Sequence, residues 1–447
     1  MSFGGPPAAD DGALQQFLLQ LGSALTAAGE AVNEVQDHLR AVALAYGADE
    51  ARFVVLPTFL VVALDPRRPA TLEPTSQLNG VLRLDQTSAL FDILDRALKG
   101  DLDPAEGSRL VLEAISRPPH YRLVFLLLGY AVLTAGLSLI LQPSGSGVVL
   151  AAGFGLLVGV LNHLARRSSV TQTLLPVAAA FLVSALTFLL ADLGWANANL
   201  KTMVAPLITF LPGAALTMAV IELSSAQMVS GASRLVSGAL QLVLLAFGIV
   251  TAAEAFGVPV TEILVEGPAL APWWIPWLGV VVFGIGIALF NSAPSDTLPG
   301  LFLVLLVAFL GQQVGSEFLG VYVGGLVGAL LMTVTARLIE RTRFGPPALV
   351  SFLPGFWLLV PGALGLIGLT EYIASGPDLA VQSLVGTLGA MVAIAIGVLC
   401  GYLLVETFRP LYRHAVRPAL DLLPFQLIPP TGDRIEDDAV EGPPDEA

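Results

Sequence analysis

The sequence predicts a polytopic α-helical membrane protein, with ten transmembrane helices arranged as two inverted five-helix repeats and preceded by a small α+β cytoplasmic domain. Of the 447 residues, 55% are hydrophobic and only 13% are charged, whereas soluble domains carry about 25% charged residues. Long apolar segments fill the chain after residue 118. A third observation is a motif that occurs twice, in which a Pro-Gly pair is followed nine residues after the glycine by a glutamate: Pro212-Gly213 with Glu222, and Pro361-Gly362 with Glu371.

Residues 1–118 are predicted to form the cytoplasmic domain. Helical periodicity runs through Leu14–Tyr46 and ends at Gly47, which is a suitable helix stop. Further helices are predicted at Ser88–Leu98 and Pro104–Ile115. The last of these has Asp103 as N-cap and a proline at its first position, which is the favoured arrangement.

Short runs with β-type composition lie between these helices. They are predicted strands at Phe53–Leu56, Phe59–Leu64 and Val81–Leu84, the first two separated by Pro57. Four ionisable residues, Glu30, Glu34, Asp37 and His38, fall on the first predicted helix. Charges on one helix face indicate a solvated surface rather than an active site.

The membrane region contains ten apolar segments that are long enough, or nearly so, to span a bilayer. The seventh is short and the ninth is interrupted by prolines. The ten segments are Tyr121–Leu141, Gly147–Ala165, Thr173–Ala191, Met203–Leu223, Leu235–Phe256, Trp273–Phe290, Leu298–Val314, Phe318–Leu338, Ala348–Ile373 and Leu384–Phe408.

Arginines between these segments set the predicted topology. If the chain crosses ten times, all of them fall on one side, which the positive-inside rule assigns to the cytoplasm. Both termini are then cytoplasmic, and residues 409–447 form an acidic tail that is predicted to be disordered. The arginines are Arg117, Arg122, Arg166, Arg167, Arg234, Arg337, Arg341, Arg343, Arg409, Arg413 and Arg417.

The duplicated motif indicates an internal repeat, because earlier landmarks align at nearly the same offset. Leu128-Gly129 corresponds to Leu278-Gly279 at an offset of 150, and the two motif glutamates lie 149 apart. Five segments per repeat is an odd number, so residues 119–268 and 269–408 are predicted to enter the membrane from opposite sides. A rival register pairs Pro212-Gly213 with Pro354-Gly355.

Broken helices and intramembrane carboxylates are typical of a substrate or proton pathway in secondary transporters. Proline and glycine free backbone groups that can hold a zwitterion, and a buried carboxylate can carry a proton or pair with an ammonium group. The alternatives are a kink that only shapes helix packing and a solvated carboxylate at the membrane interface. The candidate pathway residues are Pro212, Gly213, Glu222, Pro361, Gly362, Glu371, Thr209, Thr217 and Thr370.

Several other function classes lack their signatures in this sequence. The four histidines are scattered and Cys400 is the only cysteine, so the sequence predicts no metal site and no intrachain disulfide. No Walker motif indicates ATP-driven transport, and no catalytic set indicates an enzyme. No basic stripe predicts nucleic-acid binding. No cofactor is expected, and assembly of identical copies stays open.

The chain resembles the threonine/serine exporter family, whose members are bacterial inner-membrane carriers. In that family the acidic position after Pro-Gly is commonly aspartate, whereas this chain has glutamate in both halves. The resemblance is carried by residues 28–30, 46–48, 56–58, 81–84, 98–102 and 118–121 of the first part, by Leu211-Pro212-Gly213 and Ser230–Leu235, and by Val360–Gly376.

This resemblance implies a multi-pass protein of the bacterial cytoplasmic membrane that exports threonine, serine or similar small polar metabolites. It further implies that protons drive export, so that the partners are the substrate, protons and the lipid bilayer. A related two-component branch exports dicarboxylates, which keeps that substrate class as an alternative. A membrane-anchored sensor or scaffold without transport is the other alternative.

Overall fold

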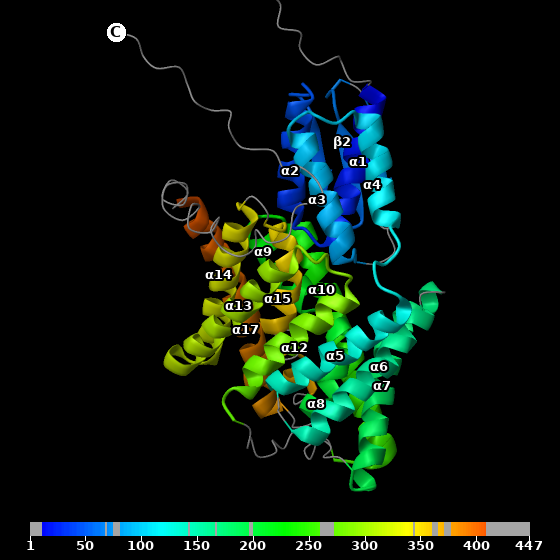
Figure 1. The fold of residues 1–447 in the computed structure, drawn as a ribbon, viewed down its shortest axis with the longest axis vertical. Coiled ribbons are helices and arrows are strands. Elements are labelled where there is room, and N and C mark those ends of the chain that lie inside the picture. The colour runs from blue at the N-terminus through cyan, green and yellow to red at the C-terminus, as the bar shows by residue number, and fades with distance from the viewer. Residues whose placement is uncertain are drawn as a thin grey trace, which may run out of the picture.

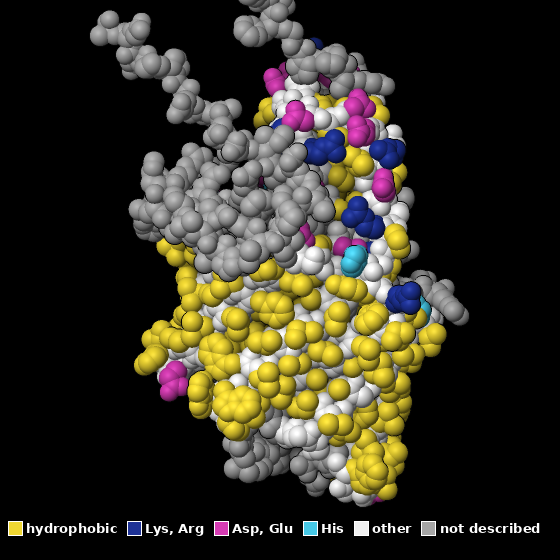
Figure 2. Space-filling model, viewed as in Figure 1, with side chains coloured by type: hydrophobic (Ala, Val, Ile, Leu, Met, Phe, Trp, Pro, Cys, Tyr) yellow, Lys and Arg dark blue, Asp and Glu magenta, His cyan; other side chains and the backbone are white. Residues whose placement is uncertain are grey.

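The computed structural model describes residues 11–67, 69–74, 81–141, 144–165, 168–195, 200–259, 272–342, 345–359, 365–370 and 377–407. Figure 1 shows an N-terminal domain at one end of a larger bundle of helices. Figure 2 shows the same division by chemistry, since charged side chains gather on the N-terminal domain and hydrophobic side chains cover the visible face of the bundle. An apolar outer face of this kind is what a bilayer stabilises.

The N-terminal domain packs four helices and a small antiparallel sheet around one apolar core. Its helices are α1 (Asp11–Ala28), α2 (Val32–Ala45), α3 (Leu84–Leu98) and α4 (Pro104–Ser116), and its strands are β1 (Arg52–Val55), β2 (Phe59–Ala63) and β3 (Thr71–Pro74). The strand order is β1-β2-β3, with Phe53 opposite Val62 in the first pair. Phe17, Leu39 and Leu60 are fully buried in the core. Asp103 caps α4 as predicted, by accepting the backbone amides of residues 105 and 106.

Two elements of this domain differ from the sequence prediction. The helical stretch Leu14–Tyr46 is two helices, because Gly29 adopts a φ of +95° that ends α1 and reverses the chain. The third strand is Thr71–Pro74, and the predicted strand at Val81–Leu84 is wrong. Residues 81–83 are irregular and α3 begins at Leu84, whose backbone amide donates to the carbonyl of Asn291 in the helical bundle. That bond ties the two parts of the molecule together.

Seven described helices are long and apolar enough to cross a membrane. They are α5 (Leu123–Leu141), α6 (Gly145–Ala165), α7 (Ser169–Asp192), α10 (Met228–Phe256, 29 residues), α13 (Leu298–Leu319), α14 (Val321–Glu340) and α17 (Pro377–Thr407). Predicted segment four is a bent pair, and the pair counts as an eighth span if it is one crossing. Segments six and nine correspond to shorter apolar helices, α12 (Ile275–Phe290) and α15 (Ala348–Leu359). A count of ten crossings therefore stays a prediction.

Helices α5 and α12 approach closely enough that glycine is required at their contact. A Cβ atom on Gly136 would lie 2.3 Å from the backbone nitrogen of Phe283, and one on Gly286 would lie 2.2 Å from that of Leu133. Real Cβ atoms do not approach backbone atoms at such distances. The two contacts are reciprocal, since each residue of the first lies 150 positions from its counterpart in the second.

Candidate functional site

Predicted segment four is broken at the Pro-Gly pair. Helix α8 (Leu200–Val204) continues into the 3-10 helix η2 (Ala205–Phe210), and α9 (Gly213–Ser224) then leaves at an angle of 63°. Pro212 has no amide hydrogen to continue the helical ladder, and the last turn before it is closed instead by the amide of Leu211, which donates to the carbonyl of Ile208 (3.1 Å). The residue types therefore explain the position of the bend.

Side chains from neighbouring helices donate to two backbone carbonyls just before the break. The hydroxyl of Tyr130 on α5 donates to the carbonyl of Pro206 (3.1 Å) and shares a hydrogen bond with Oγ1 of Thr209 (2.5 Å). The amide of Gln241 on α10 donates to the carbonyl of Phe210 (3.4 Å). The sequence analysis did not predict a role for Tyr130 or Gln241. A single tyrosine or glutamine within an apolar segment would have indicated a polar contact inside the membrane region.

Two of the predicted pathway threonines, Thr217 and Thr370, donate their hydroxyl hydrogens to backbone carbonyls of their own helices. Thr217 is fully buried and donates to the carbonyl of Gly213, one turn earlier in α9 (2.9 Å). Thr370 is also fully buried and donates to the carbonyl of Leu366 (2.8 Å). These hydroxyls lie close to the Pro-Gly pairs in sequence, but their donor hydrogens are engaged in the helix.

Glu222 lies at the far end of α9 from the break, against the N-terminal domain. Its side chain is fully buried, and its Oε1 atom lies 3.1 Å from Nε of Arg234 on α10. The same oxygen accepts the backbone amide of Val32 at the start of α2 (3.2 Å). Among the described residues, Oε2 of Glu222 has no hydrogen-bond partner. The solvated alternative for this carboxylate is therefore wrong, since the group is enclosed by both parts of the molecule.

The second Pro-Gly motif falls on residues outside those that the structure describes: Pro361, Gly362 and Glu371. The rival pair Pro354-Gly355 lies inside α15, and the helix continues through it to Leu359. The carbonyl of Leu359 accepts the side-chain amide of Gln312 on α13 (3.4 Å). Leu359 precedes Pro361 by two residues, just as Phe210 precedes Pro212. The same backbone position therefore holds a glutamine amide in both halves.

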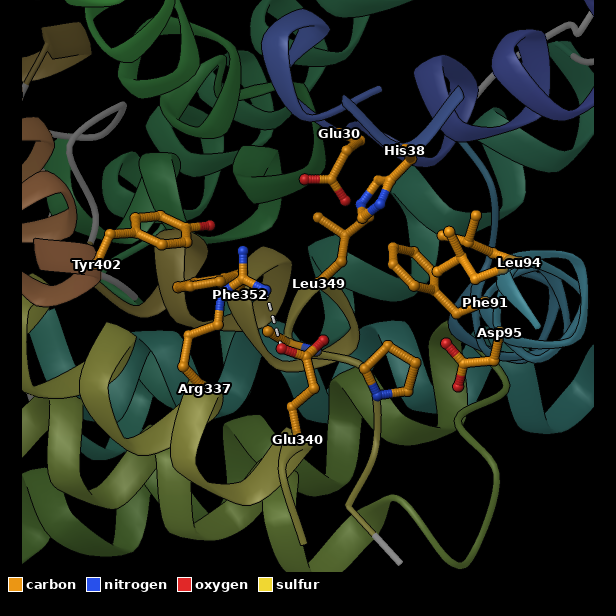
Figure 3. A pocket seen from close by; sticks show the side chains of 13 residues that line it. Glu30, His38, Phe91, Leu94, Asp95, Arg337, Glu340, Leu349, Phe352 and Tyr402 are labelled. Atoms are coloured by element: carbon orange, nitrogen blue, oxygen red, sulfur yellow. Dashed lines mark hydrogen bonds and ion pairs between the residues drawn. The ribbon is translucent and has the colours of Figure 1, made fainter. Parts of the chain in front are cut away.

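A cavity of about 610 Å³ lies between the N-terminal domain and the ends of α9, α14, α15 and α17; we call it the interdomain cavity. Its residues include Met218 and Ile221 of α9, Phe356 of α15, Leu399 of α17, and Glu30, Asn33 and Glu34 of the domain. A neighbouring pocket of about 270 Å³ shares five of its residues: Glu30, Arg337, Glu340, Phe352 and Tyr402. Figure 3 shows the smaller pocket, with the five shared residues and His38 labelled.

The cavity corrects one expectation about the N-terminal domain. Glu30 was expected on a solvated helix face, yet it lies in the turn between α1 and α2 and only 7% of it is exposed. Removal from water raises the pKa of Glu30 to about 8, and the nearby Glu34 carboxylate adds to the increase. His38 is also largely enclosed, which lowers its pKa below the ordinary value.

The family model of threonine/serine exporters, ThrE, matches residues 16–256, from α1 to the last residue of α10. The chain belongs to the threonine/serine exporter family. The matched region of this exporter-family chain contains the N-terminal domain, the break at Pro212-Gly213, Glu222 and Arg234. No curated protein and no solved structure matches the chain.

Proposed function

We propose that the chain is a secondary active transporter that exports threonine, serine or similar small polar metabolites in exchange for protons, by alternating access. The observation that carries the proposal is the 63° bend at Pro212-Gly213 in a membrane exporter family, with side chains donating to the carbonyls just before it. Such carbonyls can exchange a side-chain donor for a substrate donor without leaving a polar group unsatisfied.

An inverted repeat is part of this proposal, and the reciprocal contacts of α5 with α12 support it. Gly129 approaches Leu289 in the same way that Gly279 approaches Leu139, so a second pair of contacts between α5 and α12 follows the offset of 150. The carbonyls of Phe210 and Leu359, before the two Pro-Gly pairs, follow the offset of 149. The glutamines that donate to them, Gln241 on α10 and Gln312 on α13, are not paired by the repeat. In inverted repeats, rocking of one half against the other opens the two sides in turn.

The pathway residues keep distinct roles in the proposal. Pro212 and Gly213 with Thr209, and by the repeat Pro361 and Gly362, would form the backbone site at the two breaks. Thr217 and Thr370 would hold the helices on either side of it. Glu222 and Glu371 would exchange protons at opposite ends of the path, with the N-terminal domain, both termini and the arginines on the cytoplasmic side.

Counterflow in proteoliposomes tests the proposal. Vesicles are loaded with unlabelled threonine, serine or a small dicarboxylate, and uptake of the labelled compound is measured against empty vesicles. Threonine or serine counterflow that an imposed pH gradient accelerates is the expected result, whereas dicarboxylate counterflow alone would assign the other substrate class. No counterflow of any of these compounds would contradict transport and favour a scaffold.

A scaffold also makes an opposite prediction in cells. A Glu222→Gln, Glu371→Gln double variant should lose resistance to a threonine load if the carboxylates serve transport. Full growth of this variant at normal protein levels would contradict the proposed role of both glutamates.

A further inference from the structure

We propose that the interdomain cavity binds a small hydroxy amino acid, with its ammonium group on Glu30, its carboxylate on Arg337 and its hydroxyl on Asn33. The inference rests on the proposed function, because it names the place where the exported substrate is first held. It also gives the N-terminal domain a part in binding, since that domain supplies two of the three groups.

Glu30 is a buried carboxyl group, and the nearby Arg337 offsets only part of the increase in its pKa. It lines the cavity, and in the described parts of the chain no ion pair joins it to a lysine, arginine or histidine. The neighbouring Glu34, by contrast, has Arg337 at 3.9 Å. A buried carboxylate is stabilised by an opposite charge within hydrogen-bond distance. An ammonium group in the cavity would provide that charge.

Arg337 presents a cation to the same space, since it lines the cavity and its side chain is 24% exposed. Its guanidinium group pairs with Glu340 (2.9 Å) and lies 4.6 Å above the ring of Tyr402, which fixes its position. Its Nε atom is buried and has no hydrogen-bond partner among the described residues. In Figure 3 the side chains of Glu30 and Arg337 point toward one another from the domain and from α14. Arginine donors arranged in a plane suit a carboxylate ligand.

Asn33 supplies the third unsatisfied group. Its side-chain oxygen Oδ1 is buried without a donor among the described residues, and Asn33 lines the interdomain cavity together with Ser225, which directly follows α9. A buried acceptor without a donor costs about 1–3 kcal/mol. If the Asn33 side chain turns toward the cavity that it lines, the hydroxyl group of threonine or serine would donate to this oxygen, whereas alanine could not.

The size and location of the cavity suit such a ligand. Its volume of about 610 Å³ lies within the roughly 300–1,000 Å³ of typical small-ligand sites. Its walls come from α9 and α15, which adjoin the two Pro-Gly motifs, and Phe356 and Leu399 give it apolar sides. A molecule held here therefore lies at the N-terminal-domain side of the break at Pro212-Gly213.

Proton exchange follows from the same arrangement. Glu30 with a pKa of about 8 holds a proton near neutral pH, and an arriving ammonium group would displace that proton. Substrate and proton would then compete for one carboxyl group, which is a means of coupling them. The other charged or titratable groups around the two pockets are Glu34, His38, Asp95, Arg337, Glu340, Arg341, Tyr402 and Glu406, and Arg234 donates to the backbone carbonyl of Glu30.

Analogues that each lack one group test the assignment on the full-length purified protein. Threoninol lacks the carboxylate, 3-hydroxybutyrate lacks the ammonium group and 2-aminobutyrate lacks the hydroxyl. Affinities are measured by competition with labelled threonine for the wild type and for Glu30→Gln, Arg337→Gln and Asn33→Ala. Each variant should weaken threonine binding about tenfold or more, equivalent to about 1.4 kcal/mol, but should leave unchanged the affinity for the analogue that lacks the matching group.

A variant that only distorts the cavity would weaken all four ligands equally, and that result for all three variants would overturn the assignment. If Arg337→Gln does not fold, Glu30→Gln and Asn33→Ala still decide two of the three contacts. Ser225→Phe should fill the cavity and abolish binding. Its control is Ser224→Phe, because Ser224 is exposed and is not among the residues that line the cavity.

Calorimetry in buffers of different ionisation enthalpy gives an independent readout. Threonine binding at neutral pH should release a proton from the wild type and none from Glu30→Gln. Counterflow with the same preparations separates the two proposals. Selective binding without counterflow would contradict transport and keep this site, whereas counterflow whose substrate affinity is unchanged in all three variants would contradict the site and keep transport.

Discussion

Glu222 and Arg234 both form hydrogen bonds with the backbone of the turn between α1 and α2. Glu222 accepts the amide of Val32, and Arg234, whose Nε lies 3.1 Å from that carboxylate, donates to the carbonyl of Glu30 (3.4 Å). The N-cap residue of α2 is Ala31, whose methyl group cannot accept a hydrogen bond from a backbone amide. A carboxylate from another helix therefore caps α2, where the helix dipole favours negative charge.

Replacing one member of this pair should separate the domain from the bundle. Glu222→Gln leaves Arg234 without its counter-ion in a buried position, which typically costs about 3–5 kcal/mol. We expect a lower unfolding temperature in detergent and faster hydrogen exchange at the amide of Val32. Glu254→Gln at the other, exposed end of α10 is the control and should change neither. A Glu222→Gln protein with wild-type stability and exchange would show that the pair does not hold the domain.

The contact between α5 and α12 makes a second prediction. In Gly136→Ala or Gly286→Ala the new methyl group meets backbone rather than a movable side chain, so the helices must separate, at a cost of about 1–3 kcal/mol. Gly153→Ala on α6 is the control, because nothing lies within 4 Å of its added Cβ atom and alanine is the better helix former. Thermal unfolding should fall for the first two variants and stay level or rise for the third; equal behaviour of all three would contradict the packing.

A third prediction concerns the hydroxyl at the break. Tyr130→Phe keeps the ring against Phe290 but removes the donor to the carbonyl of Pro206 and the partner of Thr209. An unsatisfied buried carbonyl costs about 1–3 kcal/mol. We expect lower stability together with a changed rate of counterflow. Tyr121→Phe, at an irregular position before α5, is the comparison, and identical losses in both variants would argue against a special role for the hydroxyl at the break.

Glu30 makes stability depend on pH. Its pKa is about 8 in the folded protein and 4.5 as the ordinary value. The folded state therefore keeps a proton that the unfolded state loses, so the contribution of Glu30 to stability is fully present below about pH 4.5 and falls by up to about 1.4 kcal/mol per pH unit until pH 8. His38, whose pKa is lowered from 6.5, acts in the opposite direction below pH 6.5.

The window from pH 6.5 to 8 is therefore the informative one. Unfolding temperatures of the wild type should decline across it, and the decline should be smaller in Glu30→Gln. Glu34, whose pKa is also raised, contributes the same sign and remains in that variant. An equal slope in both proteins would show that Glu30 does not hold its proton.

Local chemistry made part of this structure predictable. Pro212 predicts the bend because it lacks the amide hydrogen that a continuous helix needs at that residue. Asp103 predicts the start of α4 because its side chain accepts backbone amides of the first helical turn. The strand Thr71–Pro74 has mostly exposed residues, so it carries no apolar alternation by which a sequence pattern could find it. The break at Gly29 was missed because apolar spacing continues on both sides of it.

The interdomain cavity lay beyond sequence reasoning for a different reason. Glu30 and Arg337 are far apart in the chain and meet only when the N-terminal domain rests on α9, α14 and α17. A charged helix face and a charged loop between membrane segments each predict solvent exposure when taken alone. Only tertiary contact distinguishes a buried carboxyl group from a surface one.

The length of α10 has a consequence for the surrounding lipid. A helix of 29 residues extends about 44 Å, while the hydrocarbon core of a bilayer is about 30 Å thick. The excess must be taken up by tilt or by protrusion of its ends, and thinner membranes demand more of either. Because α9 lies against Gly231 and Gly238 of α10, that adjustment reaches the broken segment directly. We therefore expect the angle at Pro212 to change with membrane thickness.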